Sequence, residues 1–150
     1  MPYSAYVGPN GRQPVTTDAR TVGAALLPCT FVTESATAFA QATAPFTTLG
    51  RLLAPRDFYS TGQLDANDPL KTAYASGDTG IAYVLEVGQR YLVAAAAATY
   101  TYGQELTIAA AGRAAAAAST NRVVAMSRHA GAVSAGDLIE VEIVLPYVKA

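Results

Sequence analysis

The side chains best suited to catalysis in this sequence are its single histidine, His129, and its single cysteine, Cys29. A histidine acts as a general base only when a nucleophile and an orienting group are arranged around it. Cys29 follows a proline and lies at no predicted helix N-terminus, so nothing in the sequence indicates a lowered thiol pKa. We interpret His129 as a surface turn residue and Cys29 as a small buried thiol. The sequence predicts a protein that is not an enzyme.

The sequence contains no motif that indicates a metal or cofactor site. One histidine and one cysteine cannot complete a zinc site. Asp65, Asn67 and Asp68 are spaced for a turn and do not match the calcium-binding loop pattern, which leaves a weak surface calcium site there as the alternative. No glycine-rich phosphate motif precedes a predicted helix. We therefore predict no cofactor and no metal.

Tyrosine is the most informative side chain, with nine copies against four phenylalanines and no tryptophan. Tyrosine combines a large contact area with a polar tip, which suits an interface that is part dry and part wet. It is also a good residue for a half-exposed strand, and both interpretations can hold for one residue. A sugar-binding cleft would use aromatic residues too, but with tryptophan among them.

Charge and hydropathy exclude two classes of partner. The formal net charge is −1, and only 14% of the residues are charged. Nucleic-acid binding would require clustered Lys and Arg, so we predict no direct contact with DNA or RNA. No apolar run approaches the roughly 20 residues that span a bilayer, so we predict no membrane contact. The first residues lack the basic start and apolar core of a secretory signal, and we expect a chain made and used in cytoplasm, or in something assembled there.

The elements that would position these side chains are short strands. The clearest is 138–145, where Ile139, Val141, Ile143 and Leu145 alternate with Glu140 and Glu142, which predicts one buried and one solvated face. Further strands are predicted at 31–33, 81–87, 90–93 and 121–127, separated by glycine turns. This pattern predicts an all-β fold, a small sandwich or barrel with at most short helical turns.

Two alanine runs are ambiguous. Residues 94–98 stand beside threonines and tyrosines and cannot nucleate an isolated helix, so we favour a small-residue strand or a loop. Residues 114–118 follow a Gly-Arg pair, and for this run we favour a helical turn over a strand or loop.

The first part of the chain differs from the rest. Residues 1–28 are rich in Gly, Pro and Thr, with a turn at 9–11 and few large apolar residues. We predict an extended N-terminal arm over 1–28, anchored to a neighbouring subunit by Tyr3, Tyr6 and Val7, followed by a β-rich domain over 29–150. An ordinary frayed terminus is the alternative for the arm.

The order of these elements resembles the head decoration, or capsid cement, proteins of tailed bacteriophages. The likeness covers residues 27–147 and runs through the segments LPCTFVTES, GRLLAPRDFYSTGQL, GDTGIAYVLEVGQRYLV, TYGQELTIAAAGR, NRVVAMSR and SAGDLIEVEIVLPY. It rests on the whole layout, because no single motif is specific. The alanine runs depart from a typical member.

The resemblance implies a virion protein on the outer surface of the phage head that cements neighbouring major capsid subunits. Its implied partners are the major capsid protein and further copies of itself, as a homotrimer or a homodimer. The alternatives are another virion component of the head-tail junction or tail, and a carbohydrate- or ligand-binding β-module. The candidate interface comprises Tyr3, Tyr6, Val7, Arg12, Arg20, Tyr59, Tyr100 and Tyr102.

Overall fold

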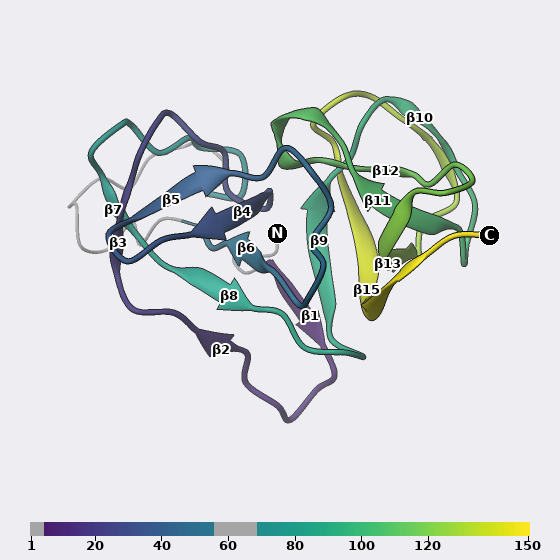
Figure 1. The fold of residues 1–150 in the computed structure, drawn as a ribbon, viewed down its shortest axis with the longest axis horizontal. Coiled ribbons are helices and arrows are strands. Elements are labelled where there is room, and N and C mark those ends of the chain that lie inside the picture. The colour runs from purple at the N-terminus through teal and green to yellow at the C-terminus, as the bar shows by residue number, and fades with distance from the viewer. Residues whose placement is uncertain (1–4, 56–68) are drawn as a thin grey trace.

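The computed structural model describes residues 5–55 and 69–150, and these residues form curled β-sheets (Figure 1). A six-stranded sheet has the order β1-β9-β15-β13-β11-β12, and a seven-stranded sheet has the order β2-β8-β6-β4-β5-β3-β7. Strands β10 and β14 form a separate pair. Within the described ranges the one helical turn is a 3-10 turn, Ala110–Gly112. The all-β prediction is confirmed.

The six-stranded sheet consists of β1 (Tyr6–Gly8), β9 (Arg90–Ala94), β11 (Glu105–Ile108), β12 (Ala114–Ala116), β13 (Arg122–Ser127) and β15 (Leu138–Val148). The seven-stranded sheet consists of β2 (Val15–Thr16), β3 (Arg20–Val22), β4 (Phe31–Glu34), β5 (Ala38–Gln41), β6 (Arg51–Leu53), β7 (Thr79–Gly80) and β8 (Ala82–Val84). The remaining pair is β10 (Ala98–Tyr100) with β14 (Gly131–Val133). The strand pairs are antiparallel except β3 with β5, which is parallel.

The main core lies between the two large sheets; in Figure 1 the seven-stranded sheet is on the left, and the six-stranded sheet extends from β1 and β9 in the middle to the right. Phe31 and Leu52 reach it from the seven-stranded sheet, and Tyr91 and Val141 reach it from the six-stranded sheet. All four side chains are fully buried, so their removal from water supplies the main force that holds the sheets together.

A second, smaller core covers the other face of the seven-stranded sheet. It contains Val32, Leu53 and Ala82 from three adjacent strands, together with Leu26 and Tyr74 from the segments that cover them. Consecutive residues of β4, β6 and β8 are therefore both buried. This is why these strands read as continuous apolar runs, whereas β15, with one covered face, alternates.

Three short strands lie within residues 1–28, the segment for which we predicted an extended arm, and they pair with strands of this same chain. Strand β1 pairs with β9 in one sheet, while β2 pairs with β8 and β3 pairs with β5 and β7 in the other. The backbone N–H and C=O groups of these short strands are thus used inside the domain. Glycine, proline and threonine gave no apolar pattern from which this pairing could be read.

Two local predictions need correction. Residues 114–116 form the edge strand β12 rather than a helical turn, because each pairs with a residue of β11. Leu145 is 66% exposed, although the alternation of β15 placed it on the buried face with Ile139, Val141 and Ile143. The alternation fails there because β15 bulges between Ile143 and Tyr147, where four steps along β15 match two along β13.

Candidate interaction surface

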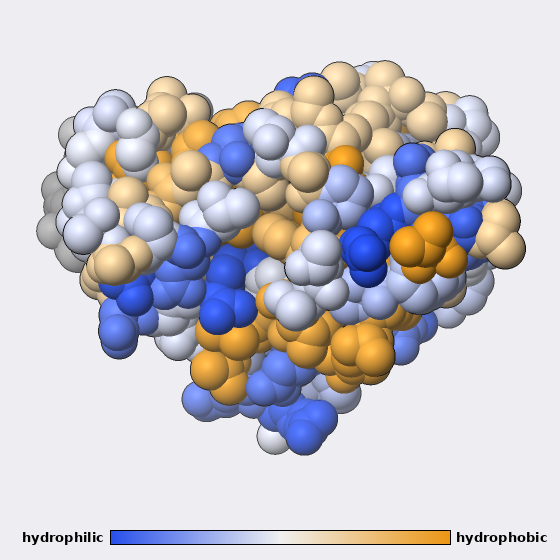
Figure 2. All heavy atoms as spheres, in the orientation of Figure 1, coloured by the Kyte–Doolittle hydropathy of each residue, from blue (hydrophilic) through white to orange (hydrophobic). Residues whose placement is uncertain are grey.

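The most distinctive surface feature is a set of exposed apolar side chains at one end of both sheets. Val15, Val87 and Leu145 are 50%, 56% and 66% exposed. Val84 lies opposite Val15 in the β2–β8 pair and is half-buried. We call these four residues the apolar rim. Figure 2 shows apolar atoms along the lower margin, over β2 and over the turn from β8 to β9.

Backbone hydrogen bonds bring the members of the apolar rim together from both sheets. The turn between β8 and β9 carries Val87, and Gly88 adopts a φ of 88° that permits its tightness. The N–H of Gly88 donates to the carbonyl of Ile143 at 2.9 Å, which holds the turn beside β15 two residues before Leu145. The buried side chain of Gln89 accepts from the N–H of Glu86 and from the Tyr91 hydroxyl, and this fixes the turn from within.

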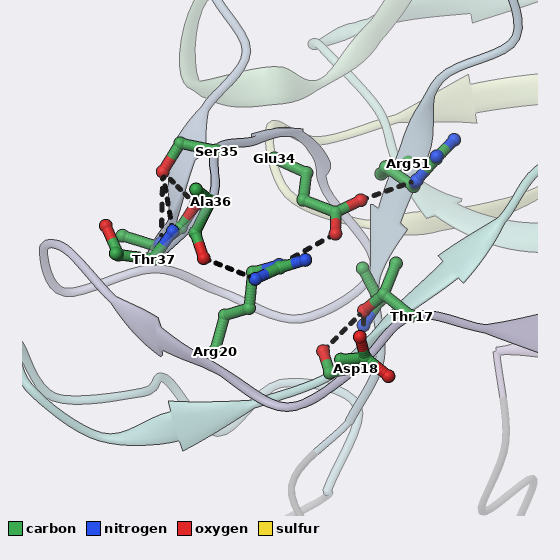
Figure 3. A network of polar contacts seen from close by, with 10 residues as sticks. Thr17, Asp18, Arg20, Glu34, Ser35, Ala36, Thr37 and Arg51 are labelled. Carbon is green, nitrogen blue, oxygen red and sulfur yellow. Dashed lines mark hydrogen bonds and ion pairs between the residues drawn. The ribbon is translucent and has the colours of Figure 1, made fainter.

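A triad of charged residues continues this surface across the seven-stranded sheet. The Nε of Arg20 lies 2.7 Å from Oε1 of Glu34, and the Nε of Arg51 lies 3.0 Å from Oε2 (Figure 3). The hydrogen bond from Arg20, helped by that from Arg51, holds the pKa of Glu34 below its usual value against the opposing effect of burial. Arg51 is also opposite Val84 in the β6–β8 pair. The charged triad, with one excess positive charge, therefore borders the apolar rim.

The predicted interface residues near the N-terminus divide between structural and exposed roles. Tyr6 packs edge-on against Tyr91 at 5.5 Å, and its hydroxyl donates to the carbonyl of Pro9 at 2.9 Å. Val7 is half-buried on the same strand, and Arg12 is exposed on the loop between β1 and β2. In Figures 1 and 2 this loop projects as a hydrophilic tip below the apolar rim. Arg12 is therefore exposed on a loop that neighbours the apolar rim.

Tyr100 is not available as an interface residue, which corrects the prediction for it. Its side chain is 1% exposed in the main core. Its hydroxyl donates to the carbonyls of Ala96 and Ala114, at 2.8 and 3.2 Å, and burial raises its pKa. Tyr3 and Tyr59 lie outside the residues that the structure describes.

Tyr102 lies on a different surface, the solvent face of the six-stranded sheet. Its ring is 64% exposed, and the guanidinium of Arg128 stacks over it at 5.4 Å. Arg128 also pairs with Glu140 and Glu142, at 3.4 and 3.1 Å, and Glu140 pairs with Arg90 at 3.5 Å. These alternating charges neutralise one another, so this face presents no basic stripe.

Sequence reasoning missed Val15, Val87 and Leu145. Single exposed apolar residues cannot be told from core residues in a sequence, because both occur in strands. One signal was available: Pro146 within β15 marks a bulge, since proline cannot donate to the ladder of a central strand. That bulge is what turns Leu145 outward.

His129 and Cys29, the residues best suited to catalysis by type, lie in the following surroundings. Ser127 lies close to His129, but its hydroxyl exchanges hydrogen bonds with the backbone N–H and C=O of His129 rather than with its ring. Cys29 is fully buried in the main core. Among residues 5–55 and 69–150, no three His, Cys, Asp or Glu side chains group as metal ligands do. The alternative calcium turn at Asp65 to Asp68 is outside those ranges. No helix within them is long and apolar enough to cross a membrane.

Comparison with known proteins shows a likeness at the level of the fold. No protein-family model and no curated protein matched the chain. Among solved structures, the chain is similar to the N base of the head fiber gp8.5 in bacteriophage phi29, with a TM-score of 0.57 and 12% identity. The likeness covers 88% of this chain and 95% of the other. At this identity it establishes a shared fold.

Proposed function

We propose that this protein is a structural component of a bacteriophage virion that attaches to the phage head. The observation that carries the proposal is the fold shared with a head-fiber base over nearly the full length of both chains. The order of sequence elements supports it independently, because it resembles head decoration proteins. In finer detail, we propose that the protein binds the outer surface of the head and cements neighbouring major capsid subunits.

The apolar rim, with Arg12 and the charged triad beside it, is our candidate for the capsid contact. An exposed apolar patch bordered by polar groups is typical of a protein interface. The strands that carry the rim are tied into both sheets, so binding would order few additional residues. A preorganised surface loses less conformational entropy on binding, and this favours affinity.

Cementing would gain further strength from repetition. As a homotrimer or a homodimer, several copies of the apolar rim would engage neighbouring capsid subunits at once. The effective concentration of each later contact is then high, and the combined avidity exceeds that of a single contact. The proposal gives the protein no catalytic role, so His129→Ala should attach to heads like the wild type.

The first test combines the mass of the protein in solution with co-sedimentation alongside empty heads of its own phage. A trimer or dimer that sediments with heads is the expected result. A protein that does not sediment with heads but binds tails or head-tail connectors would be another virion component. A monomer that binds neither and is stabilised by a glycan would be a ligand-binding module, and the proposal would fall.

Variants then test the contact surface itself. Leu145→Asp and Val87→Asp place a charge on the apolar rim and should weaken attachment at least about tenfold without loss of folding. The matched control is Val148→Asp, because Val148 is an equally exposed valine (55%) that is not part of the apolar rim and lies opposite Arg122 of β13. Equal weakening by the control would show that the rim is not the contact.

A further inference from the structure

A separate cleft of about 280 Å³ opens where the start of β15 meets β9 and the segment before β4. Leu27, Leu70 and Leu138 give it an apolar lining, and Lys71, Arg113 and Asp137 supply its charged groups. Its volume is at the lower limit of small-molecule pockets, which occupy roughly 300–1,000 Å³. It fits a side chain or a short acid better than a large cofactor.

The two cations of this cleft are not neutralised by the residues that the structure describes. Across residues 5–55 and 69–150, neither Lys71 nor Arg113 forms a side-chain hydrogen bond or an ion pair. Arg113 is half-buried, so part of its side chain is removed from water, and no described carboxylate forms an ion pair with it. This contrasts with Arg20, Arg51, Arg90 and Arg128, all of which pair with a glutamate.

The turn from Ser134 to Asp137 lines one side of the cleft and engages the carboxylate of Asp137, the acid among the lining residues. The N–H of Ser134 donates to Oδ2 of Asp137 at 2.9 Å, and the N–H of Asp137 donates back to the Ser134 carbonyl. Gly136 has a φ of 90°, which favours glycine at this turn, and it places the turn beside Nη2 of Arg113. The carboxylate of Asp137 is thus committed to its own turn, and the cleft keeps one excess positive charge.

From this geometry we infer that the cleft binds a carboxylate side chain, glutamate or aspartate, presented beside an aliphatic residue by a partner protein chain. The planar guanidinium of Arg113 can donate two parallel hydrogen bonds to a carboxylate, and Lys71 adds a mobile charge at the mouth. The leucines receive the aliphatic neighbour. The inference rests on the cleft alone and does not depend on the apolar rim.

The test is an NMR titration of the isotope-labelled full chain with the blocked peptide Ac-Ala-Leu-Glu-Leu-Ala-NH2. Its glutamine analogue and free glutarate are run in parallel. We expect the glutamate peptide to shift the amide signals of residues 135–138, and the glutamine analogue to leave them unchanged. Binding should weaken as salt is added, because two charges attract the ligand.

Substitutions identify the residues responsible. Arg113→Gln should weaken peptide binding about tenfold, and Lys71→Gln should weaken it less. Arg113→Gln removes no hydrogen bond and should keep the wild-type fold and melting temperature. Arg122→Gln is the matched control, since Arg122 is also half-buried but lies on β13 opposite Val148, at the far end of β15.

Each other outcome overturns the inference. Equal binding of the glutamate and glutamine peptides would mean that charge is not recognised. If Arg113→Gln bound the glutamate peptide as tightly as wild type, or if no probe shifted the amide signals, the cleft would not be a carboxylate site. Glutarate that binds while the peptide does not would assign the cleft to a free acid instead of a partner chain.

Discussion

The Nε of Arg20 lies 2.7 Å from Oε1 of Glu34, which joins β3, within the first 28 residues, to β4 of the main domain. The Nη1 of the same arginine donates to the carbonyl of Ala36. These side-chain bonds supplement the pairing of β3 with β5 and β7. The segment from β1 to β3 therefore folds with the domain, and the surface it carries has a fixed geometry.

Glu34→Gln should lower stability at neutral pH by about 1 kcal/mol, because two partly exposed ion pairs are lost. The pKa of Glu34 is lowered in the folded protein, so its contribution is present above the unfolded pKa and is lost as the pH falls through the folded pKa. Urea unfolding at neutral and acid pH should show the difference from wild type shrinking in acid. Asp18→Asn removes an exposed acid nearby and should have little effect; an equal loss there would refute the assignment.

Gly112→Ala should destabilise the protein by about 2–4 kcal/mol. Gly112 has a φ of 64°, and a Cβ there would clash with the carbonyl of Phe31 and the amide of Gln41, where β12 approaches the seven-stranded sheet. Gly103→Ala is the control, because its φ is 82° but its Cβ would meet nothing within 4 Å. We expect about 1 kcal/mol for the control. If Gly112→Ala and Gly103→Ala had equal melting temperatures, the close contact at Gly112 would not contribute to stability.

Val141→Asp should prevent folding, because a charge would be forced into the main core. Val141 is fully buried, whereas Val148 on the same strand is 55% exposed. Val148→Asp should therefore retain the wild-type circular dichroism spectrum and nearly its melting temperature. A folded Val141→Asp variant would show that the two faces of β15 are reversed.

Tyr91→Phe should be less stable than wild type by about 1 kcal/mol at neutral pH, because the Tyr91 hydroxyl donates to Gln89 at 2.7 Å. Burial, followed by the nearby Tyr83, Tyr6 and Glu86, raises the pKa of Tyr91 above its usual value of 10.0. A raised folded pKa contributes stability that is complete below pH 10 and is lost as the pH rises further. The gap between the variant and wild type should therefore narrow in alkaline urea unfolding. Parallel stability curves would contradict this.

Local pattern by itself determined the class of fold and five of the strands, β4, β8, β9, β13 and β15. The alternation of Ile139, Val141 and Ile143 fixed which side of β15 is buried, because one covered face imposes a period of two. Gly88 and Gly103 marked turns correctly, since both need a positive φ. These features depend on residues adjacent in sequence, so the sequence contains them in full.

Only the tertiary structure decided where residues distant in sequence meet. The pairing of β1, β2 and β3 depends on partners up to about 85 residues away, and short polar strands have no periodicity that identifies those partners. Tyr100 is buried although we expected it at an interface, and its hydroxyl bonds the carbonyl of the distant Ala114. Leu145 is exposed although we expected it in the core, because a bulge against β13 turns it outward. The apolar rim and the cationic cleft exist because both sheets pack together, and no single stretch of sequence encodes either surface.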